Sequence, residues 1–283
     1  MLSADSIFVQ GYTHNVCQDY ARTGIILSEK GFAYGILSDG CSSSPDTDIG
    51  ARLLVLTAEE AMRSGIEDCV TLSGIAHKVN DYAYMLRLPR MVLDATLLRM
   101  CYAKEQVRFS IVGDGVIAAR LKGTSQFHII QRHFANNMPW YLSYTTEPLR
   151  FQKLLERTIT IEYIHGHLNV ETGDQGVFES HSITITPKNI DSYSAEYHTT
   201  FSTSHYDLFI LMSDGVESFM ELHNTGEKTV VPLHKIFKEL FAFKRFNGEF
   251  VTRRIKKALK GFAKRQWFHE DDLSVAAIYV GEE

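Results

Sequence analysis

An apolar run that ends abruptly in Asp-Gly occurs twice in this chain and constrains its fold more than any other feature. Residues 35–40 read GILSDG, and residues 208–215 read LFILMSDG. Asp39 and Asp214 therefore stand where a buried strand ends, and the glycine after each lets the backbone turn sharply. Two strand ends of this kind are expected to bring two carboxylates to the edge of a sheet.

A third acidic position lies near the end of the chain. Asp271-Asp272 comes directly before an apolar, strand-like stretch at 273–280. Together with Asp39 and Asp214, this pair would gather several hard oxygen ligands in one place. Mg²⁺ and Mn²⁺ prefer such ligands, completed by water. The sequence therefore predicts a site for divalent metal ions.

Strand blocks alternate with helix pairs along the chain, without a strict strand-helix-strand rhythm. This order favours an α+β fold with mainly antiparallel sheets and segregated helices. The predicted helices are 45–64, 70–87, 150–156, 215–220, 232–242 and 247–264, and the predicted strands are 6–10, 23–28, 32–38, 92–101, 106–112, 116–121, 126–131, 157–165, 180–186, 207–212 and 273–280.

Two local signals make these predictions more specific. Ser44 is a good N-cap and Pro45 suits the first helical position, so the helix at 45–64 should start there. The Gly-Asp-Gly sequence at 113–115 predicts a tight hairpin between the strands on either side of it. Residues 132–205 have a weaker pattern. We interpret them as a β-rich extension or flap of a single domain that spans residues 1–283.

Composition narrows the function. The net charge of −5 over 283 residues argues against nucleic acid as the main partner, because phosphate binding needs a basic surface. The four cysteines are scattered and lack zinc-type spacing, which favours a reducing, cytoplasmic setting. No signal peptide or membrane-spanning run is expected.

Five short segments, taken in this order and at these separations, resemble the metal-dependent protein phosphatase family of the protein phosphatase 2C type. The bacterial branch of that family is the most similar. The segments are His14-x-x-Cys17-Gln18-Asp19, Ser38-Asp39-Gly40, Gly113-Asp114-Gly115, Ser213-Asp214-Gly215-Val216 and Asp271-Asp272-Leu273-Ser274.

The resemblance implies a set of metal ligands. Asp39 matches the carboxylate that bridges two ions, and the carbonyl of Gly40 matches a ligand of one of them. Asp214 and Asp271 match ligands of the other ion. Asp114 matches a residue associated with a third, weaker position. The implied ions are Mn²⁺ or Mg²⁺.

Other positions match less closely. Gln18 and Asp19 correspond to the pair that holds metal-bound waters. His14 stands where relatives usually have an arginine that grips the substrate phosphate, so His14 is expected to bind substrate and to assist catalysis with Asp19 and Asp39. Cys41 replaces a histidine that eukaryotic members use as a proposed acid.

The implied fold is a four-layer αββα sandwich, and the implied activity is hydrolysis of phosphoserine or phosphothreonine on proteins by a metal-activated water. The implied partners are phosphorylated proteins and a cognate Ser/Thr kinase or its targets. Two alternatives stay open. One is a weakened phosphatase fold that acts as a regulatory binding module, and the other is a metal-dependent hydrolase of small phosphoesters. Taken alone, each Asp-Gly is also common turn chemistry.

Overall fold

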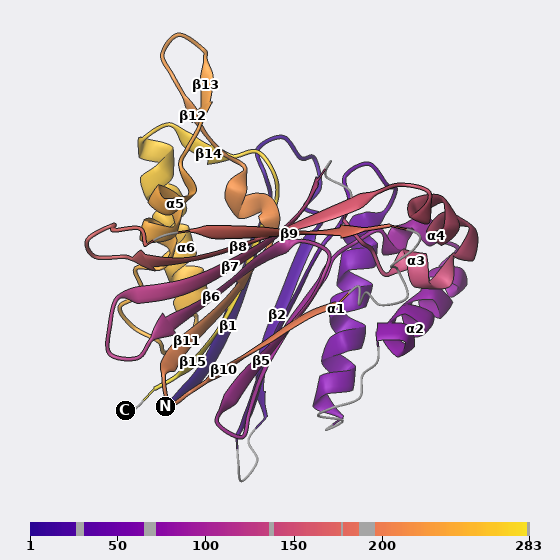
Figure 1. Cartoon of the computed structure of the whole chain (residues 1–283), viewed down its shortest axis with the longest axis horizontal. Helices are drawn as coiled ribbons and strands as arrows, with labels where there is room; N and C mark the ends of the chain where they lie inside the picture. The colour runs from indigo at the N-terminus through magenta and orange to yellow at the C-terminus, as the bar shows by residue number, and fades with distance from the viewer. Residues whose placement is uncertain (27–30, 65–71, 136–138, 177, 187–195, 282–283) are drawn as a thin grey trace.

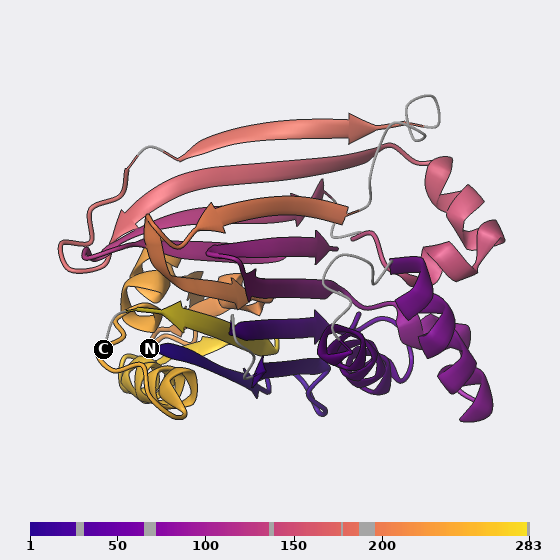
Figure 2. The same cartoon turned by 90° about the horizontal axis from the view of Figure 1, so that it is seen from below.

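Four layers make up the described part of the chain, which comprises residues 1–26, 31–64, 72–135, 139–176, 178–186 and 196–281 of this computed structural model. Two antiparallel sheets pack face to face, and helices cover the outer face of each sheet (Figures 1 and 2). This arrangement confirms the predicted α+β class and the αββα sandwich.

The larger sheet has the strand order β1-β15-β11-β6-β7-β8-β9 among the described residues, and every neighbouring pair is antiparallel. The first strand pairs with the last one, so both ends of the described chain lie in this sheet. The strands are β1 (Leu2–Val9), β6 (Gly115–Leu121), β7 (Gln126–Phe134), β8 (Ile159–Asn169), β9 (Glu179–Ile185), β11 (Tyr206–Met212) and β15 (Leu273–Val280).

The smaller sheet has the order β10-β5-β4-β3-β2 and is also antiparallel. A short three-stranded sheet, β13-β12-β14, projects at one end of the sandwich, on the side of α5 and α6 (Figure 1). These strands are β2 (Asp19–Ile26), β3 (Phe32–Asp39), β4 (Leu97–Ala103), β5 (Gln106–Val112), β10 (Glu196–Ser202), β12 (Phe219–Leu222), β13 (Lys228–Val230) and β14 (Trp267–His269).

Helices α1 (Thr47–Arg63) and α2 (Leu72–Met85) cover the smaller sheet, and α5 (Leu233–Leu240) and α6 (Phe250–Lys264) cover the larger one (Figure 1). No helix in the described part of the chain is both long enough and apolar enough to cross a membrane. The remaining helical segments are η1 (Arg90–Leu93), α3 (Ser143–Thr146), α4 (Pro148–Leu155) and η4 (Asp214–Glu217).

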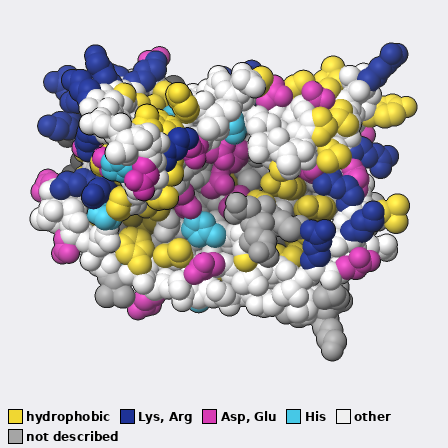
Figure 3. Space-filling model, turned by 90° about the horizontal axis from the view of Figure 1, so that it is seen from above, with side chains coloured by type: hydrophobic (Ala, Val, Ile, Leu, Met, Phe, Trp, Pro, Cys, Tyr) yellow, Lys and Arg dark blue, Asp and Glu magenta, His cyan; other side chains and the backbone are white. Residues whose placement is uncertain are grey.

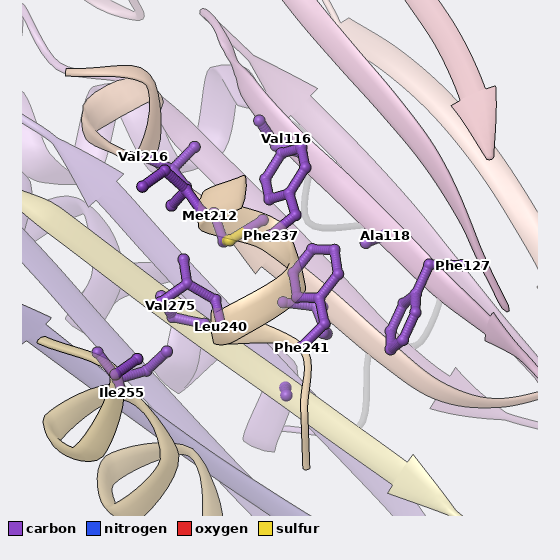
Figure 4. Packing of buried hydrophobic residues seen from close by; sticks show 14 of the residues in the cluster. Val116, Ala118, Phe127, Met212, Val216, Phe237, Leu240, Phe241, Ile255 and Val275 are labelled. Atoms are coloured by element: carbon purple, nitrogen blue, oxygen red, sulfur yellow. The ribbon is translucent and has the colours of Figure 1, made fainter. Parts of the chain in front are cut away.

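The apolar run before Asp214 is continuous because both faces of β11 are buried. Leu208, Ile210 and Met212 pack under α5 and α6, where Figure 4 shows Met212 beside Phe237. Phe209 and Leu211 point the other way, into the core between the two sheets. Side chains alternate between the faces of a strand, so one run of apolar residues serves two core layers.

The predicted hairpin at 113–115 is wrong. β5 pairs with β4 and β10 in the smaller sheet, whereas β6 pairs with β7 and β11 in the larger sheet. The Gly-Asp-Gly segment is therefore the corner at which the chain passes from one sheet to the other. Gly113 and Gly115 have φ of 92° and 138°, a backbone that other residues rarely adopt. The turn residues were read correctly, but they did not reveal which sheet each strand joins.

Three other predictions need correction. The first long helix begins at Thr47 with Asp46 at its N-cap, because Ser44 instead donates to Asp94. Residues 92–101 are not one strand, since the 3₁₀ turn η1 precedes β4. Residues 215–220 form the short turn η4 and then enter β12. The predicted start of the second helix, at 70–71, lies outside the described residues.

The segment 132–205 supplies edge strands to both sheets. β8 and β9 extend the larger sheet, and β10 pairs with β5 at the edge of the smaller one. Within it, α3 and α4 pack beside α2 at the far end of the molecule (Figure 2). The parts of this segment at 136–138, 177 and 187–195 lie outside the described residues.

Candidate metal centre

Strand ends and loops from both sheets meet at one edge of the sandwich and line an open pocket. All five predicted metal ligands lie in its wall, although they are far apart in the sequence. Figure 3 shows Asp and Glu side chains gathered in the middle of one face of the molecule. The pocket is lined by Asp39, Gly40, Cys41, Ser42, Ser43, Thr96, Asp114, Pro139, Tyr141, Asp214 and Asp271.

Asp39 is held at the end of β3 by its neighbours on both sides. In the antiparallel pairing of β2 with β3, Asp19 lies directly opposite Asp39. On the other side, the backbone N–H of Asp39 donates to Oγ1 of Thr96 (3.0 Å), and its carbonyl accepts from the Thr96 N–H (2.8 Å). Strand register therefore fixes Asp39 beside a second carboxylate.

Asp19 is 1% exposed and does not line the pocket, so it lies behind Asp39. Its Oδ2 accepts a hydrogen bond from Oγ of Ser213 (2.8 Å), the residue before Asp214. Ser213 Oγ in turn accepts from the N–H of Ser274 (2.9 Å). This chain of hydrogen bonds ties β2, the end of β11 and the start of β15 together.

Asp214 and Asp271 are brought together by close backbone packing. A Cβ added to Gly215 would lie 1.7 Å from the carbonyl oxygen of Asp272, so only glycine fits there. The N–H of Asp271 donates to Oγ of Ser218 at 3.0 Å. The glycine after Asp214 thus lets the η4 turn touch the loop that carries Asp271.

Like charges dominate the electrostatics of this pocket. Loss of solvation and the nearby charges of Asp19 and Asp214 raise the pKa of Asp39 well above its ordinary value of 3.8. Burial raises the pKa of Asp19 to about 7. Burial and then the charge of Asp214 raise the pKa values of Asp114 and Asp271. These carboxylates crowd one another, and a cation between them would relieve the repulsion.

The residues fit a divalent metal ion. Oδ1 of Asp19 and Oδ1 of Asp214 are buried and have no hydrogen-bond partner among the described residues. Buried carboxylate oxygens are normally hydrogen-bonded or bound to metal, since leaving them unpaired is costly. The donor set is one of hard oxygens, which Mg²⁺ and Mn²⁺ favour. The predicted metal ligands therefore form a site that a cation would complete.

His14 lies behind Asp271 and is not part of the pocket lining. Its Nε2 is 3.4 Å from Oδ1 of Asp271, and its Nδ1 is 3.0 Å from Oδ2 of Asp272. Burial lowers the pKa of His14, but the hydrogen bond and charge of Asp272 outweigh it, so the net shift is upward. These three residues are near enough to share a small cation. Substrate binding by His14 stays a prediction.

Asp272 organises the N-terminal loop. Its Oδ1 accepts from the N–H of Gly11 (2.6 Å), and its Oδ2 accepts from the N–H of Gln18 (2.5 Å). Gln18 donates through Nε2 to Oγ1 of Thr47 (2.7 Å) at the start of α1. The loop before β2 is therefore fixed against both β15 and α1, which positions Gln18 and Asp19 behind the pocket.

Sequence reasoning missed Glu217 and Arg132. Burial and the charge of Asp214 raise the pKa of Glu217 to about 8, and its Oε1 accepts from Nε2 of Gln131. Arg132 is fully buried and donates to the carbonyls of Ile111 and Gly113, which supports the corner that carries Asp114. The signal for Glu217 was its place three residues after Asp214, on one helical turn.

A second buried carboxylate supports the loop 41–44. Asp94 is 2% exposed, and its oxygens accept from both terminal nitrogens of Arg150 (2.8 and 2.9 Å). Oγ of Ser44 (2.7 Å) and Oγ of Ser143 (2.5 Å) also donate to it. The N–H of Cys41 donates to the carbonyl of Asp94 at 2.8 Å. This network, which links η1, α3 and α4, was also missed.

Solved structures with the same fold include bacterial phosphatases. A serine/threonine phosphatase of S. agalactiae is 13% identical with a TM-score of 0.54, over 99% of this chain and 100% of that one. For the serine/threonine phosphatase Stp1 of Staphylococcus aureus the values are 13% and 0.53, over 100% and 96%. The phosphatase domain of SpoIIE from Bacillus subtilis, solved with a regulatory fragment, gives 13% and 0.52, over 100% and 64%.

Sequence comparison identifies the family directly. Among curated proteins no sequence matches this chain significantly. A sequence model of the family described as protein phosphatase 2C, however, matches residues 12–262. This match covers most of the chain and includes the first four of the five motif segments. The chain therefore belongs to the protein phosphatase 2C family of metal-dependent serine/threonine protein phosphatases.

Proposed function

We propose that this phosphatase uses Mn²⁺ or Mg²⁺, held by Asp39, the Gly40 carbonyl, Asp214 and Asp271, to hydrolyse phosphoserine and phosphothreonine on proteins. The observation that carries the proposal is the convergence of these groups on one open pocket. Crowded carboxylates with raised pKa values, and two buried oxygens without partners in the described part of the chain, support metal binding there. Asp114, in the same wall, would hold a third and weaker ion.

When bound, a pair of divalent ions lowers the pKa of water and neutralises charge on the phosphoryl oxygens. The chain itself positions the reacting groups. Strand register sets Asp39 opposite Asp19, whose second oxygen is already fixed by Ser213. Asp19 would therefore hold a proton or a water from behind Asp39 without moving during the reaction. Fixed groups of this kind need little reorganisation in the transition state.

We assign two roles to His14, namely contact with the substrate phosphate and protonation of the leaving group. The upward shift of its pKa keeps the imidazole protonated nearer to neutral pH, so it can supply positive charge and a proton. Ser42 and Ser43 line the metal pocket, and their hydroxyls can donate to phosphoryl oxygens. This assignment fits the presence of Cys41 at the position where eukaryotic members of the family have a histidine proposed to act as the acid.

The proposed substrates are phosphorylated proteins, and the proposed counterpart is a Ser/Thr kinase or the targets of such a kinase in the cytoplasm of a bacterium. The fold neighbours named as bacterial serine/threonine phosphatases support this setting. The retained carboxylate set favours an enzyme over a binding-only module, because such a module would not need uncompensated buried charges.

The test is release of phosphate from a phosphothreonine peptide with and without Mn²⁺, for the wild type and Asp39→Asn. Metal chemistry of this kind supplies several kcal/mol, so the variant should lose roughly a thousandfold or more in kcat while keeping its fold. Asp46→Asn is the matched control, since Asp46 is exposed in the following loop and asparagine tolerates its φ of 58°.

Undiminished turnover in Asp39→Asn would contradict the assignment of that residue. No release of phosphate from any peptide by the folded protein, together with weak or absent metal binding by calorimetry, would favour the regulatory module. Release from a nucleotide but not from a phosphopeptide would instead favour a hydrolase of small phosphoesters.

A further inference from the structure

Histidines gather at one edge of the larger sheet, where β7, β8 and β9 lie side by side (Figure 1). In the antiparallel pairing of β7 with β8, His128 lies directly opposite His167. His165 stands two residues before His167, so its side chain leaves the same face of β8. Strand register therefore places three imidazoles, the histidine cluster of His128, His165 and His167, on one face of the sheet.

This face is turned toward the smaller sheet. The ring of Phe201 on β10 meets His128 edge-on, with 5.6 Å between the ring centres. Ile130, two residues after His128, belongs to the core between the two sheets. His128 and His165 are half-buried, whereas His167 is exposed. The cluster is therefore partly enclosed by protein and still reachable from solvent.

The separations of the rings suit a cation that several imidazoles bind together. The ring centres of His128 and His167 are 4.9 Å apart, and those of His128 and His165 are 6.2 Å apart. Zn²⁺ binds an imidazole nitrogen at about 2.0–2.1 Å, which places the centres of two rings on one tetrahedral ion roughly 5 Å apart. The observed separations are close to this value.

Only the orientation of the rings has to change. Among the described residues, no three donor atoms of the histidine cluster lie within 4.8 Å of one another. The torsion that turns an imidazole ring has broad minima, so the rings can turn toward one centre at small cost. The backbone that spaces them is held by the pairing of β7 with β8 and does not need to move.

The ring nitrogens of the cluster are available to a ligand. None of the three residues makes a side-chain hydrogen bond or an ion pair with a protein group in the part of the chain that the structure describes. Burial, together with the nearby charges of His167 and His165, lowers the pKa of His128 to about 4. Burial and the charge of His181 lower the pKa of His165. These rings are therefore neutral at pH 7, which is the form that binds metal.

A fourth histidine stands beside the cluster but is held differently. His181 on β9 lies directly opposite Tyr163 in the pairing of β8 with β9. Its ring stacks on that of Tyr163, with 5.1 Å between the ring centres and 12° between the ring planes. Turning His181 toward a cation would break this stack, so we exclude it from the ligand set.

The cluster is separate from the metal centre and differs from it in chemistry. Gly115, beside Asp114, pairs with Arg132 on β7, and His128 lies four residues further along that strand. At about 3.4 Å per residue, the distance along the strand is roughly 14 Å. The carboxylates favour Mg²⁺ and Mn²⁺, whereas imidazole nitrogens favour Zn²⁺, Cu²⁺ and Ni²⁺.

We propose that the histidine cluster binds a divalent transition-metal cation of the zinc class, with water as the fourth ligand. The ion would cross-link β7 to β8 and so fasten β8, which lies within the segment 132–205, to the rest of the larger sheet. The proposal does not rest on the phosphatase reaction, since no residue of the cluster lines the metal pocket.

The experiment measures Zn²⁺ binding to the full chain by calorimetry, in the presence of Mg²⁺. The wild type should bind one more Zn²⁺ than His165→Gln/His167→Gln, or hold that ion at least about a hundredfold more tightly. Zn²⁺ that enters the carboxylate pocket contributes equally to both proteins and cancels in the comparison. The matched control is His181→Gln/His198→Gln, which removes two exposed imidazoles outside the cluster and should keep the ion.

Two further readouts separate coordination from an effect on folding. Co²⁺, used in place of Zn²⁺, should give the visible absorption of a tetrahedral site in the wild type, the control and Asp214→Asn, but not in the cluster variant. Zn²⁺ should also raise Tm more in the wild type and the control than in the cluster variant. If the double variant folds poorly, His167→Gln alone changes only an exposed side chain and tests the same ligand.

Equal Zn²⁺ binding by the wild type and the cluster variant would overturn the proposal. So would an equal loss in the control, because the ion would then depend on exposed histidines in general. Loss of the ion in His14→Gln, with the cluster intact, would place it at the group of His14, Asp271 and Asp272 instead. Each outcome is read from binding or absorption, so loss of phosphatase activity would leave all of them interpretable.

Discussion

Two buried carboxylate centres adjoin the loop 41–44, but protein groups satisfy the charge of only one of them. Asp94 receives an arginine fork and two hydroxyl donors, so both of its oxygens are satisfied. Around Asp39 the neighbours are other carboxylates, and buried oxygens of Asp19 and Asp214 have no partner among the described residues. The first centre is complete as the chain folds, whereas the second needs a cation.

The comparison shows that one centre stabilises the fold, whereas the other one destabilises it. The complete centre stands behind the pocket and fixes the loop that lines it. The incomplete centre is strained by like charges until a metal ion binds. A rigid support beside a destabilised site is the arrangement expected when pre-organisation serves catalysis.

The largest effect should come from breaking the complete centre. Arg150→Met leaves Asp94 buried without its counter-charge, which typically costs about 3–5 kcal/mol. Urea unfolding monitored by circular dichroism would measure the loss. Lys153→Met, an exposed change on the same helix, should stay within about 0.5 kcal/mol. A loss below about 1 kcal/mol in Arg150→Met would show that Asp94 does not depend on this ion pair.

Metal should stabilise only the incomplete centre. Mn²⁺ at a hundred times its Kd should add about 2.7 kcal/mol to the free energy of unfolding. Arg150→Met should keep this increment, because its lesion is elsewhere. Asp214→Asn should lose most of it. An equal metal increment in wild type and Asp214→Asn, measured by Tm across a Mn²⁺ titration, would place the ion away from this residue.

The pH dependence of the metal-free protein should have the opposite sign from that of an ordinary salt-bridged carboxylate. The pKa of Asp19 is about 7 in the folded protein and 3.8 ordinarily, so the folded state keeps a proton that the unfolded state has lost. The contribution of Asp19 to stability is complete below pH 3.8 and disappears as pH rises to about 7. Asp39, with its raised pKa, acts in the same direction.

The measurement is the stability difference between wild type and Asp39→Asn at pH 5 and pH 7.5, which cancels contributions from the rest of the chain. Without metal, the wild type should lose stability relative to the variant as pH rises. Saturating Mn²⁺ should remove or reverse that trend. A flat difference in the absence of metal would mean that the carboxylates do not repel one another.

The smallest effect concerns one hydrogen bond of the complete centre. Ser44→Ala removes a donor to Oδ2 of Asp94 and should cost about 1.5 kcal/mol, since three donors remain. Ser42→Ala in the same loop is exposed and should be close to neutral in urea unfolding. A neutral Ser44→Ala would show that Arg150 and Ser143 satisfy Asp94 without Ser44.

Much of the fold could be predicted from sequence because the signals were local. Asp39 and Asp214 stand at the ends of apolar runs that are strands, and the helix predicted at 247–264 is α6. Sheet membership was not local. The Gly-Asp-Gly corner has the residues of a hairpin, and only long-range pairing shows that its two strands join different sheets.

The residues of the site also divide into those that have a local sequence signal and those that do not. The predicted metal ligands stand out because each ends or precedes a strand, and the structure brings them into one pocket. Arg150 and Asp94 are 56 residues apart, and neither stands in a recognisable motif. His14 was placed near phosphate by resemblance, but its contacts with Asp271 and Asp272 depend on a loop whose course no local pattern fixes.

Because the first strand pairs with the last one, the larger sheet can be completed only late in the synthesis of the chain. Within the larger sheet β1 has β15 as its neighbour, with Leu2 opposite Val280. At ordinary translation rates, the two strands leave the ribosome roughly 15–55 s apart. Asp271 emerges just before β15, so an unfinished chain lacks both a sheet partner for β1 and a metal ligand. Nascent chains without residues 271–280 should therefore bind no catalytic metal, and dephosphorylation cannot begin before this segment has emerged.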